Sequence, residues 1–103
     1  MLLIRDIMYC KPGKTRAMGD KFLAMSKLGV KAGMPAMRVL TDVSAGRYWT
    51  VVSEMQVENL TAYEAMFENM GHGKEEMKEM EEIMKGYHDL VTEGRREILK
   101  IEG

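Results

Sequence analysis

Residues 2–10 read LLIRDIMYC, and this stretch decides the fold. Its side chains alternate as in a β-strand, but both alternating sets are largely apolar. One set is Leu2, Ile4 and Met8, and the other is Leu3, Ile7 and Tyr9. A strand that is apolar on both sides is usually buried on both sides. We therefore expect a central strand here, ended by the turn residues Pro12 and Gly13.

A second stretch, residues 48–57 (YWTVVSEMQV), is also apolar on both faces through its first half. Residues 36–43 (AMRVLTDV) come just before it and alternate between charged and apolar positions. The short Ser44-Ala45-Gly46 segment between the two stretches predicts a hairpin. Residues 95–102 (RREILKIE) form the last predicted strand.

Two helical regions separate these strands. From Thr15, apolar residues recur at helical spacing until Gly33 and Pro35 end the pattern. Thr61 with Glu64 forms a capping box that predicts the start of the second region. Gly71-His72-Gly73 interrupts it, and a longer helix is predicted from Lys74. The apolar stripe of this helix is Met77, Met80, Met84, Tyr87 and Val91, and Gly94 occupies the position expected for a left-handed cap.

The element order is therefore β-α-β-β-α-β, an α+β ferredoxin-like domain spanning residues 1–103. Right-handed crossovers give an antiparallel sheet in the order 4-1-3-2, with the two doubly apolar strands at the centre. The predicted edge strands carry more charge, as at Arg38, Asp42 and Arg96. The helices cover only one face of such a sheet. An uncovered apolar face usually marks an interface, so we expect a homodimer.

Composition and charge limit the partners and the cellular location that we expect for this protein. The net charge is −1 with both signs interspersed, which argues against nucleic acid and anionic membranes as partners. No apolar run is long enough to span a membrane. Cys10 is the single cysteine, so no internal disulfide can form. With no signal-peptide pattern near Met1, we expect a cytoplasmic location.

The 12 methionines are an unusual feature of a chain of 103 residues. Methionine is flexible and fills irregular spaces, so a methionine-rich core is one interpretation. An adaptable ligand cavity is the other. Tyr9, Trp49 and Tyr63 are amphipathic aromatic residues, and at least one of them suits the wall of such a cavity. Contacts in the core or at a dimer interface are the other interpretation of these residues.

Two histidines are the candidates for chemistry. His88 is suited to act as a general base near neutral pH, with Tyr87 and Asp89 beside it in sequence. His72 lies between two glycines, in a segment suited to gating a pocket and contacting its ligand. No His, Cys or carboxylate spacing suggests a metal site, and no cofactor motif is found. Gly13-Lys14-Thr15 lacks the first glycine of a phosphate-binding loop, because Met8 stands there.

Asp6, Arg38 and Glu54 are charged residues within predicted strands. Cross-strand ion pairs or solvated strand ends are the ordinary explanation for such charges. A carboxylate directed into the interior would instead indicate function, since burying an unpaired charge is unfavourable.

The element order resembles that of the dimeric α+β barrel superfamily. Residues 5–14 (RDIMYCKPGK), 87–91 (YHDLV) and 95–99 (RREIL) resemble the NIPSNAP-like group of small bacterial proteins. The resemblance implies a ligand cavity between sheet and helices and a range of activities. These activities include cofactor-free oxygenation, isomerisation, haem degradation and roles in stress responses. The Asn, Trp and His arrangement of the haem-degrading members does not map onto this chain.

The leading hypothesis is a homodimeric domain that binds a small apolar or aromatic metabolite without a cofactor. It would act as a monooxygenase or isomerase, with His88 as base. The alternative is a non-catalytic binding or assembly module, which predicts a filled space between sheet and helices. Haem handling is a weaker third hypothesis.

Overall fold

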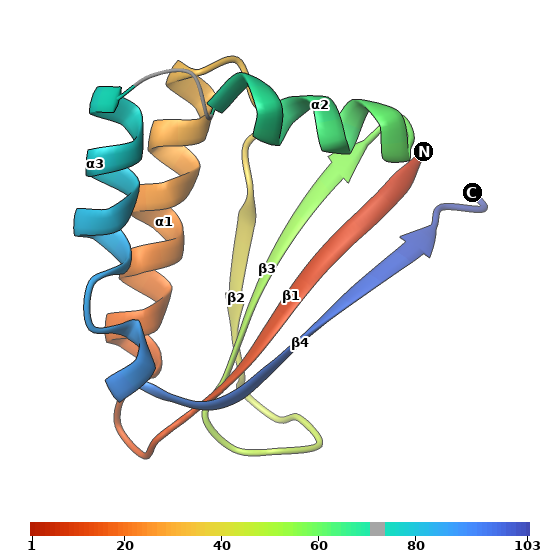
Figure 1. The fold of residues 1–103 in the computed structure, drawn as a ribbon. Coiled ribbons are helices and arrows are strands. Elements are labelled where there is room, and N and C mark those ends of the chain that lie inside the picture. Colours follow the sequence, from red (N-terminus) through yellow and green to blue (C-terminus); the bar gives the residue numbers. More distant parts are fainter. Residues whose placement is uncertain (71–73) are drawn as a thin grey trace.

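A computed structural model describes residues 1–70 and 74–103 of the chain. Four strands form one antiparallel sheet in the order β2-β3-β1-β4, and the helices lie on one side of it (Figure 1). The predicted fold and strand order are thus confirmed. The elements are β1 (Leu2–Cys10), α1 (Thr15–Lys31), β2 (Arg38–Thr41), β3 (Thr50–Val57), α2 (Leu60–Met70), α3 (Lys74–Met84), the 3₁₀-helix η1 (Tyr87–Asp89) and β4 (Val91–Lys100).

The register of β1 defines the two faces of the sheet. β1 pairs with β3 from Leu2↔Val57 to Tyr9↔Thr50, and it pairs with β4 on its other edge. Ile4, Asp6 and Met8 point toward the helices, on what we call the helix-covered face. Because side chains alternate along a strand, Leu3, Arg5, Ile7 and Tyr9 lie on the opposite, open face.

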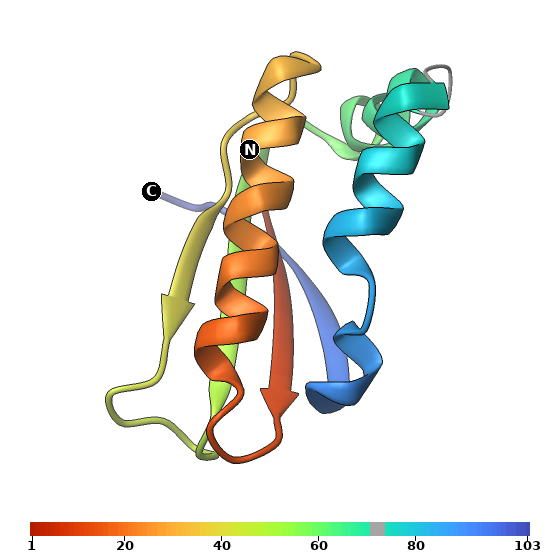
Figure 2. The same ribbon diagram turned by 90° about the vertical axis from the view of Figure 1, so that its left-hand side faces the viewer.

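The helices form an incomplete cover over the sheet. α1 and α3 run side by side (Figure 2), whereas α2 crosses the end of the sheet at the C-terminus of β3 (Figure 1). Lys21 joins α1 to the C-terminal end of α3, because its Nζ donates to the carbonyl oxygens of Ile83 (2.9 Å) and Lys85 (2.7 Å). A cation at this position also complements the C-terminal end of the α3 dipole.

Two buried clusters hold the helices on the sheet. Cys10, Met18, Phe22 and Val51 form one cluster beneath α1. Ile4 and Val57 form the other with Tyr63, which α2 contributes. The space between sheet and helices is therefore packed at both ends of β1.

The C-terminal helix is shorter than its apolar periodicity predicts. Gly86 has φ +81°, a left-handed conformation that glycine adopts without strain, and it terminates the segment that includes α3. Val91 begins a strand, so its expected place on the helical stripe is wrong. Gly94 is not the cap either, because it lies within β4. A Cβ there would lie 2.5 Å from Met8 Sδ, so the absence of a side chain allows β4 to approach β1.

The hairpin between β2 and β3 also differs in detail from the one that the sequence predicts. β2 ends at Thr41 and β3 begins at Thr50, so the connection is longer than the predicted turn. The carboxylate of Asp42 closes it by accepting the backbone N–H groups of Trp49 (3.2 Å) and Thr50 (3.0 Å).

The cap of α2 is one of these differences. Asn59 Oδ1 accepts the backbone N–H of Ala62 at 2.8 Å, so the capping residue is Asn59 and not Thr61. Asparagine is a stronger cap than threonine, and its position two residues earlier explains why the helix already includes Leu60.

Among the helices in the described part of the chain, none is long and apolar enough to cross a membrane.

Candidate functional site

A cavity of about 240 Å³ lies between the helix-covered face and the helices. Methionine dominates its wall: Met8 and Met55 come from the sheet, Met25, Met80 and Met84 from α1 and α3, and Met34 and Met37 from the segment between α1 and β2. These side chains are unbranched and polarizable, so they can repack around molecules of different shape. The methionine content thus lines a space as well as filling a core.

The polar part of the cavity wall is a short strip across three strands. Asp6 of β1 is paired in register with Ser53 of β3 on one side and with Arg96 of β4 on the other. Arg96 Nε donates to Asp6 Oδ1 at 2.6 Å, and Nη2 lies 3.4 Å from Oδ2. The hydrogen bond to Asp6 raises the pKa of the Arg96 guanidinium. The guanidinium of Arg96 therefore stays charged at neutral pH and is paired with the carboxylate of Asp6.

The ion pair lies where the cavity opens to solvent. The side chain of Asp6 is 24% exposed and that of Arg96 is 51% exposed. Arg96 belongs to β4, which is an edge strand of the sheet. A molecule inside the cavity would thus have apolar surroundings at its body and an ion pair at its outer end.

Tyr63 of α2 is the aromatic residue of this site. It is buried, lines the cavity, and its ring centroid is 5.9 Å from the guanidinium carbon of Arg96. Burial raises the pKa of the phenol, Asp6 adds to the increase, and Arg96 opposes it. The phenol therefore remains protonated at neutral pH.

The other predicted wall residues lie elsewhere. Tyr9 is on the open face, where the guanidinium of Arg47 lies 3.9 Å from its ring centroid. Trp49 is an exposed residue at the end of the hairpin connection, with φ +60°, and it does not line the cavity. His72 lies outside the described residues. The structure therefore places one of the three predicted aromatic residues, Tyr63, at the cavity.

His88 lies in η1, next to the cavity and not inside it. Its ring is 3.9 Å from that of Tyr87, measured between centroids. It lines a shallow groove along β4 that shares Asp6, Met8 and Arg96 with the cavity. His88 and the ion pair thus border one continuous region of the surface.

Sequence reasoning missed Arg96 as a site residue. Asp6 was recognisable as a charge between the apolar residues Ile4 and Met8, which share its face. Arg96 stood within a charged run and looked like an ordinary edge residue. Only the pairing of β1 with β4 identifies it as the partner of Asp6.

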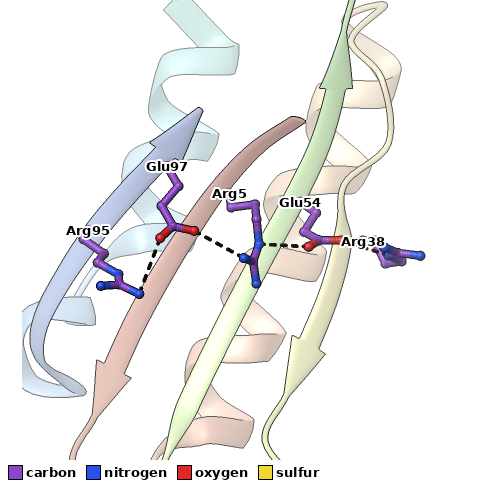
Figure 3. Close-up of polar contacts among 5 residues, drawn as sticks. All are labelled: Arg5, Arg38, Glu54, Arg95 and Glu97. Atoms are coloured by element: carbon purple, nitrogen blue, oxygen red, sulfur yellow. Dashed lines mark hydrogen bonds and ion pairs between the residues drawn. The ribbon is translucent and has the colours of Figure 1, made fainter. Parts of the chain in front are cut away.

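The open face carries a different polar arrangement. Four side chains of alternating charge cross all four strands in the order Glu97, Arg5, Glu54, Arg38, and Figure 3 shows Arg5 between the two carboxylates. Arg5 Nε lies 3.0 Å from Glu54 Oε2, and Arg5 Nη1 lies 3.2 Å from Glu97 Oε1. Arg38 Nη2 lies 2.6 Å from Glu54 Oε1. We call these four residues the charge row.

Because of the charge row, the open face is less apolar than the sequence predicts. Ile7 and Val52 lie on this face, but they are only 4% and 9% exposed within the single chain. Leu40 and Leu99 are its more exposed apolar residues, at 38% and 45%. The expected continuous apolar patch is therefore wrong: the face is a mixed surface with charges across its middle.

The described residues offer neither a metal site nor a reactive thiol. Within residues 1–70 and 74–103, no group of three or more His, Cys, Asp or Glu side chains could hold a metal ion. Cys10 is buried in the core, and burial together with the charge of Asp42 raises the pKa of its thiol. A raised pKa disfavours the reactive thiolate.

Comparison with solved structures identifies the fold. A NIPSNAP-like domain protein from Burkholderia xenovorans has a TM-score of 0.76 at 14% identity, over 99% of this chain and 85% of that chain. A NIPSNAP family protein from Agrobacterium tumefaciens gives 0.72 at 10% identity, over 96% and 90% of the two chains. A putative antibiotic biosynthesis monooxygenase from Nitrosomonas europaea gives 0.67 at 13% identity, over the full length of both chains.

The chain thus has an α+β ferredoxin-like fold, and its structural neighbours include NIPSNAP-like proteins and a putative monooxygenase. Identities this low establish the fold alone. At the level of sequence, no family model matches the chain, and no curated protein does either.

Proposed function

We propose that this protein binds a small apolar metabolite in the methionine-lined cavity. The observation that carries the proposal is a cavity of about 240 Å³ whose wall is apolar except for Asp6, Arg96, Ser53 and Tyr63. Binding sites for small molecules commonly combine an apolar wall with a few convergent polar groups. The methionines hold the body of the ligand, and the polar strip orients its outer end.

The cavity favours ligand binding over the assembly-module alternative. An assembly module of this fold needs no internal space, and a packed interior would be more stable. An unfilled volume lined by flexible side chains is more readily explained by a guest that occupies it.

Catalysis by His88 is a second candidate function. The supporting observation is the groove along β4, in which His88 lies near the ion pair and the cavity entrance. In this reaction, His88 would remove a proton from a carbon of the ligand. Molecular oxygen would then oxidise the resulting carbanion, or His88 would return the proton to another carbon in an isomerisation. His88→Ala should abolish turnover of a bound ligand and leave binding intact, and an active variant would remove His88 from the mechanism.

We further propose that the open face pairs with a second copy of the chain. The charge row runs −, +, −, + from β4 to β2, so rotation about an axis parallel to the strands exchanges its two halves. Arg5 then lies opposite the partner's Glu54, and Arg38 lies opposite the partner's Glu97. An axis perpendicular to the strands would instead place each charge on its own copy. The row is therefore self-complementary in only one of the two arrangements.

The binding proposal can be tested through the methionines themselves. In protein labelled with ¹³C at the methionine methyl groups, 1-octanol should shift the signals of Met8, Met25 and Met84, which line the cavity. The signal of Met77, which is 47% exposed and does not line the cavity, serves as the internal control. Shifts confined to exposed methionines would contradict the proposal.

A further inference from the structure

The ion pair at the cavity entrance is positioned to discriminate between ligands by charge. Asp6 and Arg96 come from neighbouring strands, and their 2.6 Å contact places one negative and one positive group at the same end of an apolar space. Their charges offset each other. The cavity wall therefore offers a dipole, with a hydrogen-bond acceptor at Asp6 and donors at Arg96, and carries no net charge there.

A charged ligand end would meet an opposing group in this arrangement. A carboxylate that approached Arg96 would compete with Asp6 and be repelled by it. An ammonium group that approached Asp6 would be repelled by Arg96 in the same way. An uncharged hydroxyl group faces neither penalty, since it can donate to the carboxylate and accept from the guanidinium.

We infer that the cavity selects apolar molecules with an uncharged hydroxyl end over carboxylates and amines of the same length. This inference rests on the proposed ligand-binding function and adds the class of ligand. This preference arises because the two charges are paired. Loss of the Asp6 charge should therefore favour carboxylates, and loss of the Arg96 charge should favour amines.

Three probes with one chain length test the inference: 1-octanol, octanoate and octylammonium. Any apolar cavity favours the alcohol to some degree, so the informative quantity is the change in relative affinity between variants. Asp6→Asn keeps the shape of the side chain but leaves Arg96 uncompensated, so octanoate should gain about five- to tenfold relative to 1-octanol. Arg96→Gln leaves Asp6 uncompensated, so octylammonium should gain by a similar factor.

Two further variants separate charge from shape. The double variant Asp6→Asn/Arg96→Gln has no net charge at the entrance and should restore the preference of the unmodified protein. Asp20→Asn, on the exposed surface of α1, makes the same change of charge away from the cavity and should leave all three affinities unchanged. Dispersed methionine methyl signals show that each variant is folded, and titration of those signals gives each dissociation constant.

The outcomes distinguish this inference from the function on which it rests. Binding of all three probes with relative affinities that Asp6→Asn and Arg96→Gln leave unchanged would overturn the selection by charge, and binding would stand. Failure of all three probes to shift the cavity methionines in any variant would overturn the binding function and the selection together. Opposite changes in the two single variants, reversed in the double variant, would support the inference.

Discussion

The two faces of the sheet carry the same kind of ion pair in different surroundings. Both carry arginine–carboxylate pairs between neighbouring strands, and β4 supplies Arg96 to one face and Glu97 to the other. On the helix-covered face, one pair stands beside an apolar cavity. On the open face, three pairs share their members and form a row across the sheet.

This difference shows that surroundings decide what an ion pair does. The central pair of the charge row is itself partly buried, with the side chains of Arg5 and Glu54 32% and 11% exposed. Its alternating charges suit the row to setting the alignment of a partner. The Asp6–Arg96 pair borders an apolar space, where a single added charge has a larger effect. Changes to one face should therefore leave the property of the other face intact.

The largest expected effect comes from filling the cavity. Gly29 of α1 lines it, and a Cβ there would make only an ordinary 3.6 Å contact with Met34. Gly29→Leu should weaken 1-octanol binding at least about tenfold, because the leucine occupies the space of the ligand. Lys27→Leu adds the same side chain on the exposed surface of α1 and serves as the control. Methionine methyl titrations measure both, and unchanged binding in Gly29→Leu would place the ligand elsewhere.

A change to the charge row should weaken self-association and leave ligand binding unchanged. Glu54 contacts both Arg5 and Arg38, so Glu54→Gln should raise the dimer dissociation constant about tenfold. Sedimentation equilibrium measures this constant, and the matched control is Glu79→Gln on the exposed surface of α3. A protein that is monomeric before any substitution would refute the proposed interface. Binding of 1-octanol should be the same in both variants.

The close approach of β4 to β1 limits the size of the side chain that position 94 can carry on the helix-covered face. Gly94→Ala places a Cβ against Met8 Sδ and near the carbonyl oxygen of Ile7, so Met8 must move toward the cavity. We expect a loss of about 1 kcal/mol of unfolding free energy in urea, and a displaced Met8 methyl signal. Gly46→Ala, where a Cβ would meet nothing within 4 Å, should be close to neutral. Equal effects at the two positions would contradict the close approach.

The smallest expected effect is a pH dependence of stability on the helix-covered face. Burial raises the folded-state pKa of the Tyr63 phenol above its unfolded value. The unfolded chain therefore loses this proton first, and stability falls as the pH rises from about 10 through the folded pKa. Tyr63→Phe should reduce this alkaline loss, measured by urea unfolding between about pH 9 and 11. Tyr48→Phe, at an exposed tyrosine, is the control, and an identical pH profile in all three proteins would contradict the raised pKa.

Local patterns in the sequence were sufficient to predict the order of the elements. Residues 2–10 are apolar on both faces because their strand is central, and this property can be read without any partner strand. The same patterns failed at the end of α3, where apolar side chains at Tyr87 and Val91 continue the helical spacing although the backbone changes conformation at Gly86. Both residues still pack against the core, so the stripe reflects burial and not helix.

The candidate site was less accessible to prediction. Tyr63 and Asp6 could be singled out from the sequence, one as an amphipathic aromatic residue and the other as a charge on an apolar face. Tyr9 could not be assigned to a face, because the alternation along a strand does not say which set meets the helices. The methionines were recognisable as an unusual group, but helical spacing is the same for a filled interior and for a lined cavity.

The sequence by itself thus determined which stretches are strands or helices and in what order they follow, because this depends on the periodicity of neighbouring residues. The strand order of the sheet then followed from the handedness of the crossovers. Tertiary structure alone decided that Asp6 pairs with Arg96, since strand register joins residues that are far apart in the chain. It also decided that the methionines enclose a space, because a cavity depends on the distance between packed elements. For the same reason, the charge row became visible only when all four strands were aligned.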